Sequence, residues 1–593
     1  MKPIQWMVAL AASLVPVWLV LDAWGGGKPL VYALGGFFPL TDGAIYWVCS
    51  LQLAALGEVP GPFGWVAFDS GGYCTNRPSH AGLLATLQLL AGFDPHVLLL
   101  LLGLIIGVGM AYLFLEVART FGWLAAGVTY ALVLAYASAH ALSMFTSESS
   151  GLFLGLLGVG LLVRFVRTDA WSDAWLGIAA VSIGLFARAG AMLALPLLFL
   201  WIIRHARQRR GGDRYAFLAK GVCCLAAGYL LQRALLALIG DSSSGYFSNF
   251  SVVLYALATG SRNWREALVI SGVETPPPVE TLNVLLPVAI SKVMEQPGTF
   301  LLSLAAAERD YLATLFHLPL IQAVGALLTA LLVIGAARIA ASVRRRGCQA
   351  LLLLALGEVL SAPLVFDADG SRVFATSFPV RCVLAAVGIS MLWRLLAAVI
   401  HRRPLSPMLS GAAAIPRDQT PAPGATWWPP AAALAGITLA TLFAATPLAR
   451  PFRLQPVPVG DAICPDTAPP VILIANRASS ALFIGGEAAA AGRSGTVSVA
   501  ALDREVRHAW FRNDFARLPE NTLLLRGIDR SPSNFGREIS IAWFNADSSL
   551  RDGEVLRFCV PHLDHPPYRE FVTLAVHRFF LASPPPSAAT KPK

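Results

Sequence analysis

The sequence predicts an α-helical polytopic membrane protein with about eleven transmembrane helices and a C-terminal, mostly β extracytoplasmic domain. Of its 593 residues, 56% are hydrophobic and only 13% are charged, which is about half the charged share of a soluble globular protein. Apolar runs of roughly 20 residues recur along the chain. The basic residues gather in short clusters between these runs. That pattern is typical of cytoplasmic loops and does not indicate a nucleic-acid partner.

The first predicted span, 6–23, follows Met1-Lys2 directly. No small-residue cleavage site comes after it, so we expect an uncleaved span and not a removed signal peptide. The other spans are expected at 96–118, 121–141, 150–167, 173–187, 189–204, 215–239, 318–342, 349–366, 376–400 and 429–447.

The number of spans depends on residues 173–204, which could form one helix or two. A charge at mid-bilayer costs several kcal/mol, and a two-helix hairpin places Arg188 at the far surface instead. The hairpin also puts every basic cluster on the side of Lys2, which the positive-inside rule assigns to the cytoplasm. These clusters are Arg204, Arg207, Arg209, Arg210 and Arg214; Arg344–Arg346; and Arg402–Arg403. We therefore expect a multi-pass protein of the inner (plasma) membrane with a cytoplasmic N-terminus.

The composition divides the chain into five parts. Residues 1–403 form the main transmembrane domain, and the Pro-, Ala- and Gly-rich residues 404–428 form a cytoplasmic linker before the last span, 429–447. Residues 448–583 are expected to form the extracytoplasmic β-rich domain, and 584–593 a disordered tail. The predicted strands are Val471–Ile474, Thr496–Val499, Thr522–Leu525 and Ile539–Trp543.

The eight cysteines show no metal-type spacing. Cys223, Cys224 and Cys382 lie within apolar runs and are expected to be packed thiols. Four others lie in segments placed outside the cytoplasm and form two candidate disulfide pairs, Cys49/Cys74 and Cys464/Cys559. The sequence alone leaves the pairing open.

Carboxylates and arginines gather in the predicted outside loops. The candidate site residues are Asp42 and Arg77 in the first loop, Glu148 in the second, Arg188 at the hairpin tip, Arg309 in the third long loop and Arg372 in the last inter-helix loop. A lipid-phosphate-linked sugar presents its phosphate at headgroup depth. Arginine binds phosphate bidentately, and a carboxylate can accept the proton of an attacking hydroxyl.

Four of these candidates also have a purely structural interpretation. Asp42 is a suitable N-cap for a helix that begins near Ala44, and Glu148 suits an interfacial carboxylate. Arg188 and Arg372 can snorkel to lipid headgroups.

Aromatic residues and a short acidic motif flank these candidates. The aromatic run that includes Tyr46 is more typical of an interfacial belt than of a sugar platform, and Tyr46 is kept as a substrate-binding candidate. Asp367 and Asp369 form an Asp-x-Asp pair that could hold a divalent ion. Short acidic loops are usually solvated, so we expect neither a metal nor another cofactor.

Together these residues resemble the polytopic glycosyltransferases of the GT-C type, which use polyprenyl-phosphate sugars. The resemblance covers most of residues 1–400. It is carried by Asp42, Arg77-Pro78, Glu148, the hairpin from Arg188-Ala189-Gly190 to Pro196, Asn249–Gly260 with Trp264, and Asp369–Thr376.

The resemblance implies that residues 1–403 are the catalytic domain of an inverting hexosyl- or pentosyltransferase. It matches Asp42 to the catalytic base and makes Glu148 a second catalytic candidate. The acceptor would be an envelope glycan, a lipid or a protein. Many relatives carry two adjacent acidic residues in the first loop, whereas this chain has Asp42-Gly43, which puts a metal there in doubt. The C-terminal domain resembles outer domains that often bind carbohydrate.

Other functions remain open at this stage. A lipid-linked glycan polymerase or ligase would use the same kind of donor. A transporter would carry polar or broken helices near mid-membrane, whereas most charged residues here lie at predicted helix ends. A scaffolding membrane protein would not need a charged cluster in its outer loops.

Overall fold

The computed structural model describes most of the helical part of the chain and six strands near its C-terminus. The described residues are 3–25, 42–57, 77–93, 95–142, 145–239, 248–261, 279–316, 318, 321–365, 370–401, 428–453, 470–474, 481–484, 522–528, 538–543, 554–559 and 576–580. The predicted linker and tail lie outside these residues, apart from Trp428.

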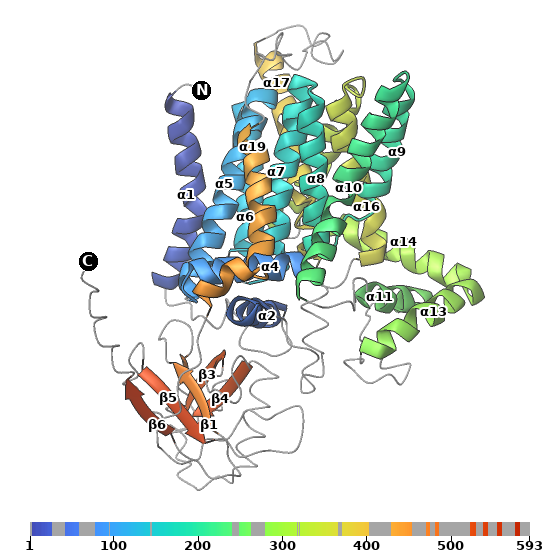
Figure 1. Cartoon of the computed structure of the whole chain (residues 1–593). Coiled ribbons are helices and arrows are strands. Elements are labelled where there is room, and N and C mark those ends of the chain that lie inside the picture. Colours follow the sequence, from blue (N-terminus) through green and yellow to red (C-terminus); the bar gives the residue numbers. More distant parts are fainter. Residues whose placement is uncertain are drawn as a thin grey trace.

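Long apolar helices run side by side and form a single bundle (Figure 1). A helix occupies each of the predicted spans, because these stretches are apolar and contain few helix-breaking residues. The bundle helices are α1 (Pro3–Gly25), α5 (Pro95–Phe121), α6 (Trp123–His140), α7 (Ser147–Thr168), α8 (Trp171–Ala187), α9 (Ala194–Arg207), α10 (Gly212–Ile239), α15 (Gly325–Ala340), α16 (Arg346–Val365), α17 (Phe378–Ile400) and α19 (Trp428–Phe443).

Seven helices of the described chain are long and apolar enough to cross a membrane. They are Val97–Phe121, Trp123–His140, Ser147–Thr168, Gly212–Ile239, Gln322–Ala340, Arg346–Val365 and Phe378–Ile400. Three shorter helices are also apolar: Met7–Asp22, Trp171–Ala187 and Pro430–Phe443. The chain thus has the helices of a multi-pass membrane protein, whereas the count of eleven spans stays a prediction.

Residues 171–207 form two helices, as predicted, and not one. Helix α8 ends at Ala187, and Arg188 has extended backbone angles. Helix α9 starts at Ala194. Gly190 lies in the break, against the backbone of the segment that carries Arg372.

Helix α7 is the buried centre of the bundle. It packs against α5, α8, α16 and α17, and almost all of its residues are buried. Four glycines let its neighbours approach closely: Gly151, Gly155, Gly158 and Gly160. Such small residues are typical of close helix contacts in membranes.

The other five α-helices described lie at one end of the bundle (Figure 1). Helix α2 (Asp42–Leu56) packs against α4 (Pro78–Leu90), and both lie across that end. Pro78 occupies the first helical position of α4, where its missing N–H costs nothing. The other three are α11 (Ser248–Ala258), α13 (Val279–Glu295) and α14 (Pro297–Ala313).

The six described strands form two three-stranded antiparallel sheets, in the orders β1-β5-β6 and β2-β3-β4. Their bounds are β1 (Pro470–Ile474), β2 (Ala481–Ile484), β3 (Thr522–Ile528), β4 (Glu538–Trp543), β5 (Glu554–Cys559) and β6 (Val576–Phe580). Three of the four predicted strands coincide with β1, β3 and β4, and the fourth, 496–499, lies outside the described residues. The sheets lie on the side of the bundle that carries α2 (Figure 1).

The cysteines differ in their bonding. Cys49 in α2 is in a disulfide bond. The thiols of Cys223, Cys224 and Cys382 are free, as expected, and so is that of Cys348. The predicted partners Cys74 and Cys464 lie outside the described residues, as does the side chain of Cys559.

Candidate functional site

A buried carboxylate shared by two arginines lies at the start of α7. Glu148 is fully buried, and its Oε1 is 3.1 Å from Nη2 of Arg188. Nε of Arg372 donates to the same oxygen. The side chains of Arg188 and Arg372 are 11% and 22% exposed. Because a buried charge is stable only when it is paired, the three residues act as one unit with a net charge of +1.

The packing of glycines explains why residues so distant in sequence meet here. A Cβ on Gly155 would overlap the carbonyl oxygen of Thr376, and one on Gly190 would overlap that of Val373. A Cβ on Gly151 would lie 2.8 Å from Cβ of Arg188. These glycines therefore allow α7, the 188–193 break and the segment after Arg372 to lie in contact.

The segment that carries Arg372 is also fixed from α6. It forms a short 3-10 helix, η2 (Gly370–Phe374). Tyr136 of α6 is fully buried, and its hydroxyl donates to the carbonyl oxygen of Arg372 at 2.7 Å. The Tyr136 ring also stacks on Phe378, with the ring centroids 4.2 Å apart. The backbone of Arg372 is thus held in place independently of its side chain.

A second buried ion pair, between Arg381 and Glu358, lies against η2. Arg381 of α17 donates through Nε to Glu358 of α16 and through Nη1 to the carbonyl oxygen of Leu315. The hydroxyl of Tyr311 donates to the same Glu358 oxygen at 2.9 Å. The Arg381 guanidinium also lies 4.9 Å from the ring centroid of Phe374, the last residue of η2. The pair therefore links α14, α16 and α17 to the segment that holds Arg372.

Helices α2 and α4 close the site with His80 and Tyr46. Nδ1 of His80 lies 2.8 Å from the hydroxyl of Ser150, and Nε2 lies 3.3 Å from the carbonyl oxygen of Phe145. The carbonyl can only accept, so Nε2 carries the proton and Nδ1 accepts from Ser150. Tyr46 is buried and packs edge-on against His80, with ring centroids 5.0 Å apart.

Burial keeps His80 neutral. It lowers the pKa of this imidazole from 6.5 to about 4, outweighing the opposing effects of the Phe145 carbonyl and of Glu148. The nearby positive charges of Arg188 and Arg77 lower the pKa further. Arg77 is the N-cap residue of α4. The same electrostatic neighbourhood thus contains Arg77, His80, Glu148 and Arg188.

The other predicted residues either lie away from the Glu148 unit or have side chains outside the described part of the structure. Asp42 is the first residue of α2, which packs on α4 beside this cluster, but its side chain lies outside the described part of the structure. Arg309 lies on α14 and is 69% exposed, paired with Asp310; no contact joins it to the Glu148 unit within the described residues. Asp367 and Asp369 lie outside the described residues.

The sequence interpretation missed His80, Tyr136, Glu358 and Arg381. For Glu358 and Arg381 a signal was present, because each is an ionisable residue inside a predicted span and such residues usually have a specific role. His80 and Tyr136 gave no such signal, since a single histidine or tyrosine in an apolar helix is common.

The arrangement is suited to binding an anion at one end of the bundle. In the described part of the chain, no group of three His, Cys, Asp or Glu side chains is arranged to hold a metal ion. The chain matches no protein-family model, and no curated protein is significantly similar to it in sequence.

Proposed function

We propose that the chain is a membrane glycosyltransferase that takes its sugar from a polyprenyl-phosphate donor and transfers it, with inversion, to an envelope glycan, lipid or protein acceptor. The observation that carries the proposal is the unit formed by Glu148, Arg188 and Arg372 at the bundle end. Its net positive charge beside apolar helices suits a ligand that has a phosphate head and a hydrocarbon tail.

In this proposal Arg188 and Arg372 bind the donor phosphate. Both guanidinium groups are already directed at one anionic oxygen, that of Glu148. The two guanidinium groups, held by this carboxylate, also suit a phosphate, because a planar guanidinium group binds carboxylate and phosphate alike. A carboxylate shared by two arginines is poorly placed to accept a proton. We therefore assign Glu148 to positioning the arginines and not to proton transfer.

Asp42 is proposed as the general base. It takes the proton of the acceptor hydroxyl while that oxygen forms a bond to the anomeric carbon of the sugar. The bond from this carbon to the phosphate oxygen breaks, and the polyprenyl phosphate leaves with the electron pair. Arg188 and Arg372 stabilise the charge that develops on the leaving phosphate. Arg77 and Tyr46, at the same bundle end, are proposed to contact the donor or acceptor.

The orientation belongs to the same proposal: eleven spans, a cytoplasmic N-terminus and a site on the outer face of the membrane. Cys49, in the helix that starts with Asp42, is in a disulfide, and disulfides persist in oxidising compartments. The described strands lie on this same side (Figure 1). We propose that residues 448–583 form an outer domain that contacts the acceptor.

The test is sugar transfer by the purified full-length protein in nanodiscs, with radiolabelled polyprenyl-phosphate sugars as donors. We expect Asp42→Asn to lower the rate about 10²–10⁴-fold with donor binding unchanged, because asparagine keeps the capping ability but not the basicity. Arg188→Ala and Arg372→Ala should instead weaken donor binding. The matched control is Arg309→Ala, which removes an exposed arginine at the same end.

Four results would reject parts of this proposal. Activity of Asp42→Asn within a few-fold of the parent would remove Asp42 as the base. Donor binding that is unchanged in both arginine variants would remove the phosphate site. Transfer of a whole oligosaccharide would indicate a polymerase or ligase, and solute movement without transfer would indicate a transporter.

A further inference from the structure

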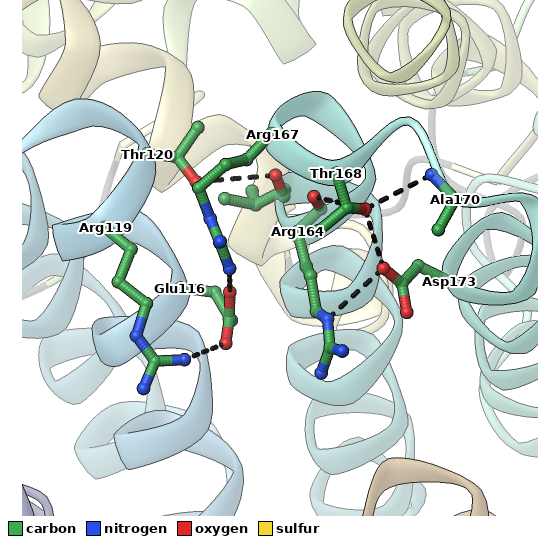
Figure 2. Close-up of polar contacts among 9 residues, drawn as sticks. Glu116, Arg119, Thr120, Arg164, Arg167, Thr168, Ala170 and Asp173 are labelled. Carbon is green, nitrogen blue, oxygen red and sulfur yellow. Dashed lines mark hydrogen bonds and ion pairs between the residues drawn. The ribbon is translucent and has the colours of Figure 1, made fainter. Parts of the chain in front are cut away.

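A second charged network lies at the opposite end of α7 from Glu148. Figure 2 shows its side chains. Glu116 of α5 is only 1% exposed and accepts hydrogen bonds from two arginines. Nη1 of Arg119 donates to its Oε1 at 2.6 Å, and Nη2 of Arg167 donates to its Oε2 at 3.1 Å. Figure 2 shows both guanidinium groups directed at Glu116, one from α5 and one from α7.

A neighbouring ion pair extends the network to α8. Nε of Arg164 lies 3.2 Å from Oδ2 of Asp173, which also accepts from the hydroxyl of Thr168 at 2.8 Å. The network contains three arginines and two carboxylates, so its net charge is +1. This end also carries the basic residues 344–346, of which Arg346 lies 3.5 Å from Asp169. The network therefore lies in a region of positive charge.

Arg119 lines a hollow on the surface of this end. The hollow has a volume of about 170 Å³ and is lined by Leu115, Ala118, Arg119 and Trp123. By this measure a single water needs only about 10–15 Å³, so a phosphate headgroup has room. The Arg119 side chain is 30% exposed, against 13% for Arg164 and Arg167.

Arg119 is held in place yet keeps donors for a ligand. Among the described residues its one partner is Glu116, which engages Nη1. A guanidinium has five N–H donors, and the described residues engage only Nη1 of this side chain, which lines the hollow. Glu116 is itself fixed by Arg167. The guanidinium is thus positioned before any ligand arrives.

From the hollow towards the middle of α5, the exposed surface of that helix is apolar. Residues 104, 108, 115 and 119 of α5 share one face at helical spacing, and Leu104 and Val108 are 41% and 52% exposed. Trp123, at the start of α6, is 53% exposed and packs against Phe114. Tryptophan with an arginine above an apolar face is typical of the membrane–water interface.

We propose that this hollow binds one anionic phospholipid of the surrounding bilayer. The lipid phosphate accepts from Nε and Nη2 of Arg119, Trp123 packs beside the glycerol region, and an acyl chain follows the face from Leu115 to Leu104. The net positive charge of the network selects an anionic headgroup. The apolar face selects a lipid over free phosphate, because only the lipid has a hydrocarbon chain that can pack against it.

The test is native mass spectrometry of the delipidated, full-length protein in detergent. Phosphatidylglycerol, phosphatidylcholine and inorganic phosphate are titrated separately. We expect one phosphatidylglycerol to bind about tenfold more tightly than phosphatidylcholine, and inorganic phosphate not to displace it. Arg119→Gln should abolish this preference. The matched control, Arg344→Gln, removes an exposed arginine at the same end and should retain it.

Equal binding of the two lipids by the parent protein would overturn the proposal, and so would a preference that survives in Arg119→Gln. Displacement by inorganic phosphate would assign the hollow to a free anion. Trp123→Leu leaves every ion pair of the network intact and guards against a folding defect in Arg119→Gln. It should weaken phosphatidylglycerol binding several-fold, and unchanged binding in this variant would also count against the lipid site.

Discussion

His80 shows how burial fixes the charge of a single side chain at the candidate site. Its two ring nitrogens are satisfied by one donor, Ser150, and one acceptor, Phe145. A protonated ring would have two donors, and Ser150 would have to reverse its hydrogen bond. The neutral ring therefore suits this pocket, in line with a pKa of about 4.

This histidine should make the stability of the protein sensitive to acid. The pKa of His80 falls from 6.5 to about 4 on folding, so the unfolded chain binds the proton first. The stabilisation is complete above pH 6.5 and is lost as the pH falls towards 4, by about 3 kcal/mol in all. We expect the unfolding temperature in detergent to fall between pH 6.5 and 4.5.

The variant His80→Gln should flatten this dependence, because the titrating group is gone. His401→Gln, which removes an exposed histidine, is the matched control and should follow the parent. A parent-like pH profile in His80→Gln would show that other groups cause the acid sensitivity.

At the scale of elements, the closest backbone approach at the site depends on glycine. Helix α7 and the segment after Arg372 touch at Gly155, where no side chain fits. Because Thr376 is four residues from Arg372, we expect a displacement of this segment to disturb the contact between Arg372 and Glu148. The glycines are thus part of how the charged unit is built.

We expect Gly155→Ala to destabilise the protein by about 1–3 kcal/mol, the usual cost of overpacking, and to weaken donor binding. Thermal unfolding and a donor-binding assay measure the two effects. Gly127→Ala on α6 is the matched control, because nothing lies within 4 Å of its added methyl group. It should be neutral or slightly stabilising. Equal stability of the two variants would contradict the packing argument.

The elements were easier to predict from sequence than the contacts between them. Hydropathy located the bundle helices, and the cost of a buried charge placed a helix break at Arg188. The pairing of Glu148 with Arg372 joins residues 224 positions apart, and it depends on which glycines face each other. Hydropathy carries no information on that choice. For the same reason the role of His80 could not be predicted, because its partners Ser150 and Phe145 come from a segment distant in sequence.

At the scale of the whole molecule, charge gathers at the two ends of one bundle. One end has the Glu148 unit and the Cys49 disulfide, and the other has the network of Glu116 and the basic residues 344–346. The positive-inside rule then predicts that the end with residues 344–346 faces the cytoplasm.

Cysteine labelling of intact cells measures this orientation. We expect a cysteine at Gly211, between α9 and α10, to be protected from a membrane-impermeant reagent. A cysteine at Ser533 in the C-terminal region should react. The reverse pattern would invert the topology and place the candidate site in the cytoplasm. Permeabilised cells, in which both positions should react, provide the control.

Helix α7 joins both ends, and its length has a consequence for the bilayer. Glu148 and Arg167 lie nineteen residues apart on it, or about 28 Å at the rise of an α-helix. That separation is close to the roughly 30 Å thickness of a hydrocarbon core. The Glu148 unit and the Glu116 network are therefore separated by about the thickness of a hydrocarbon core, and the length of α7 sets this separation. A markedly thicker or thinner membrane would pull one of the two out of the headgroup region.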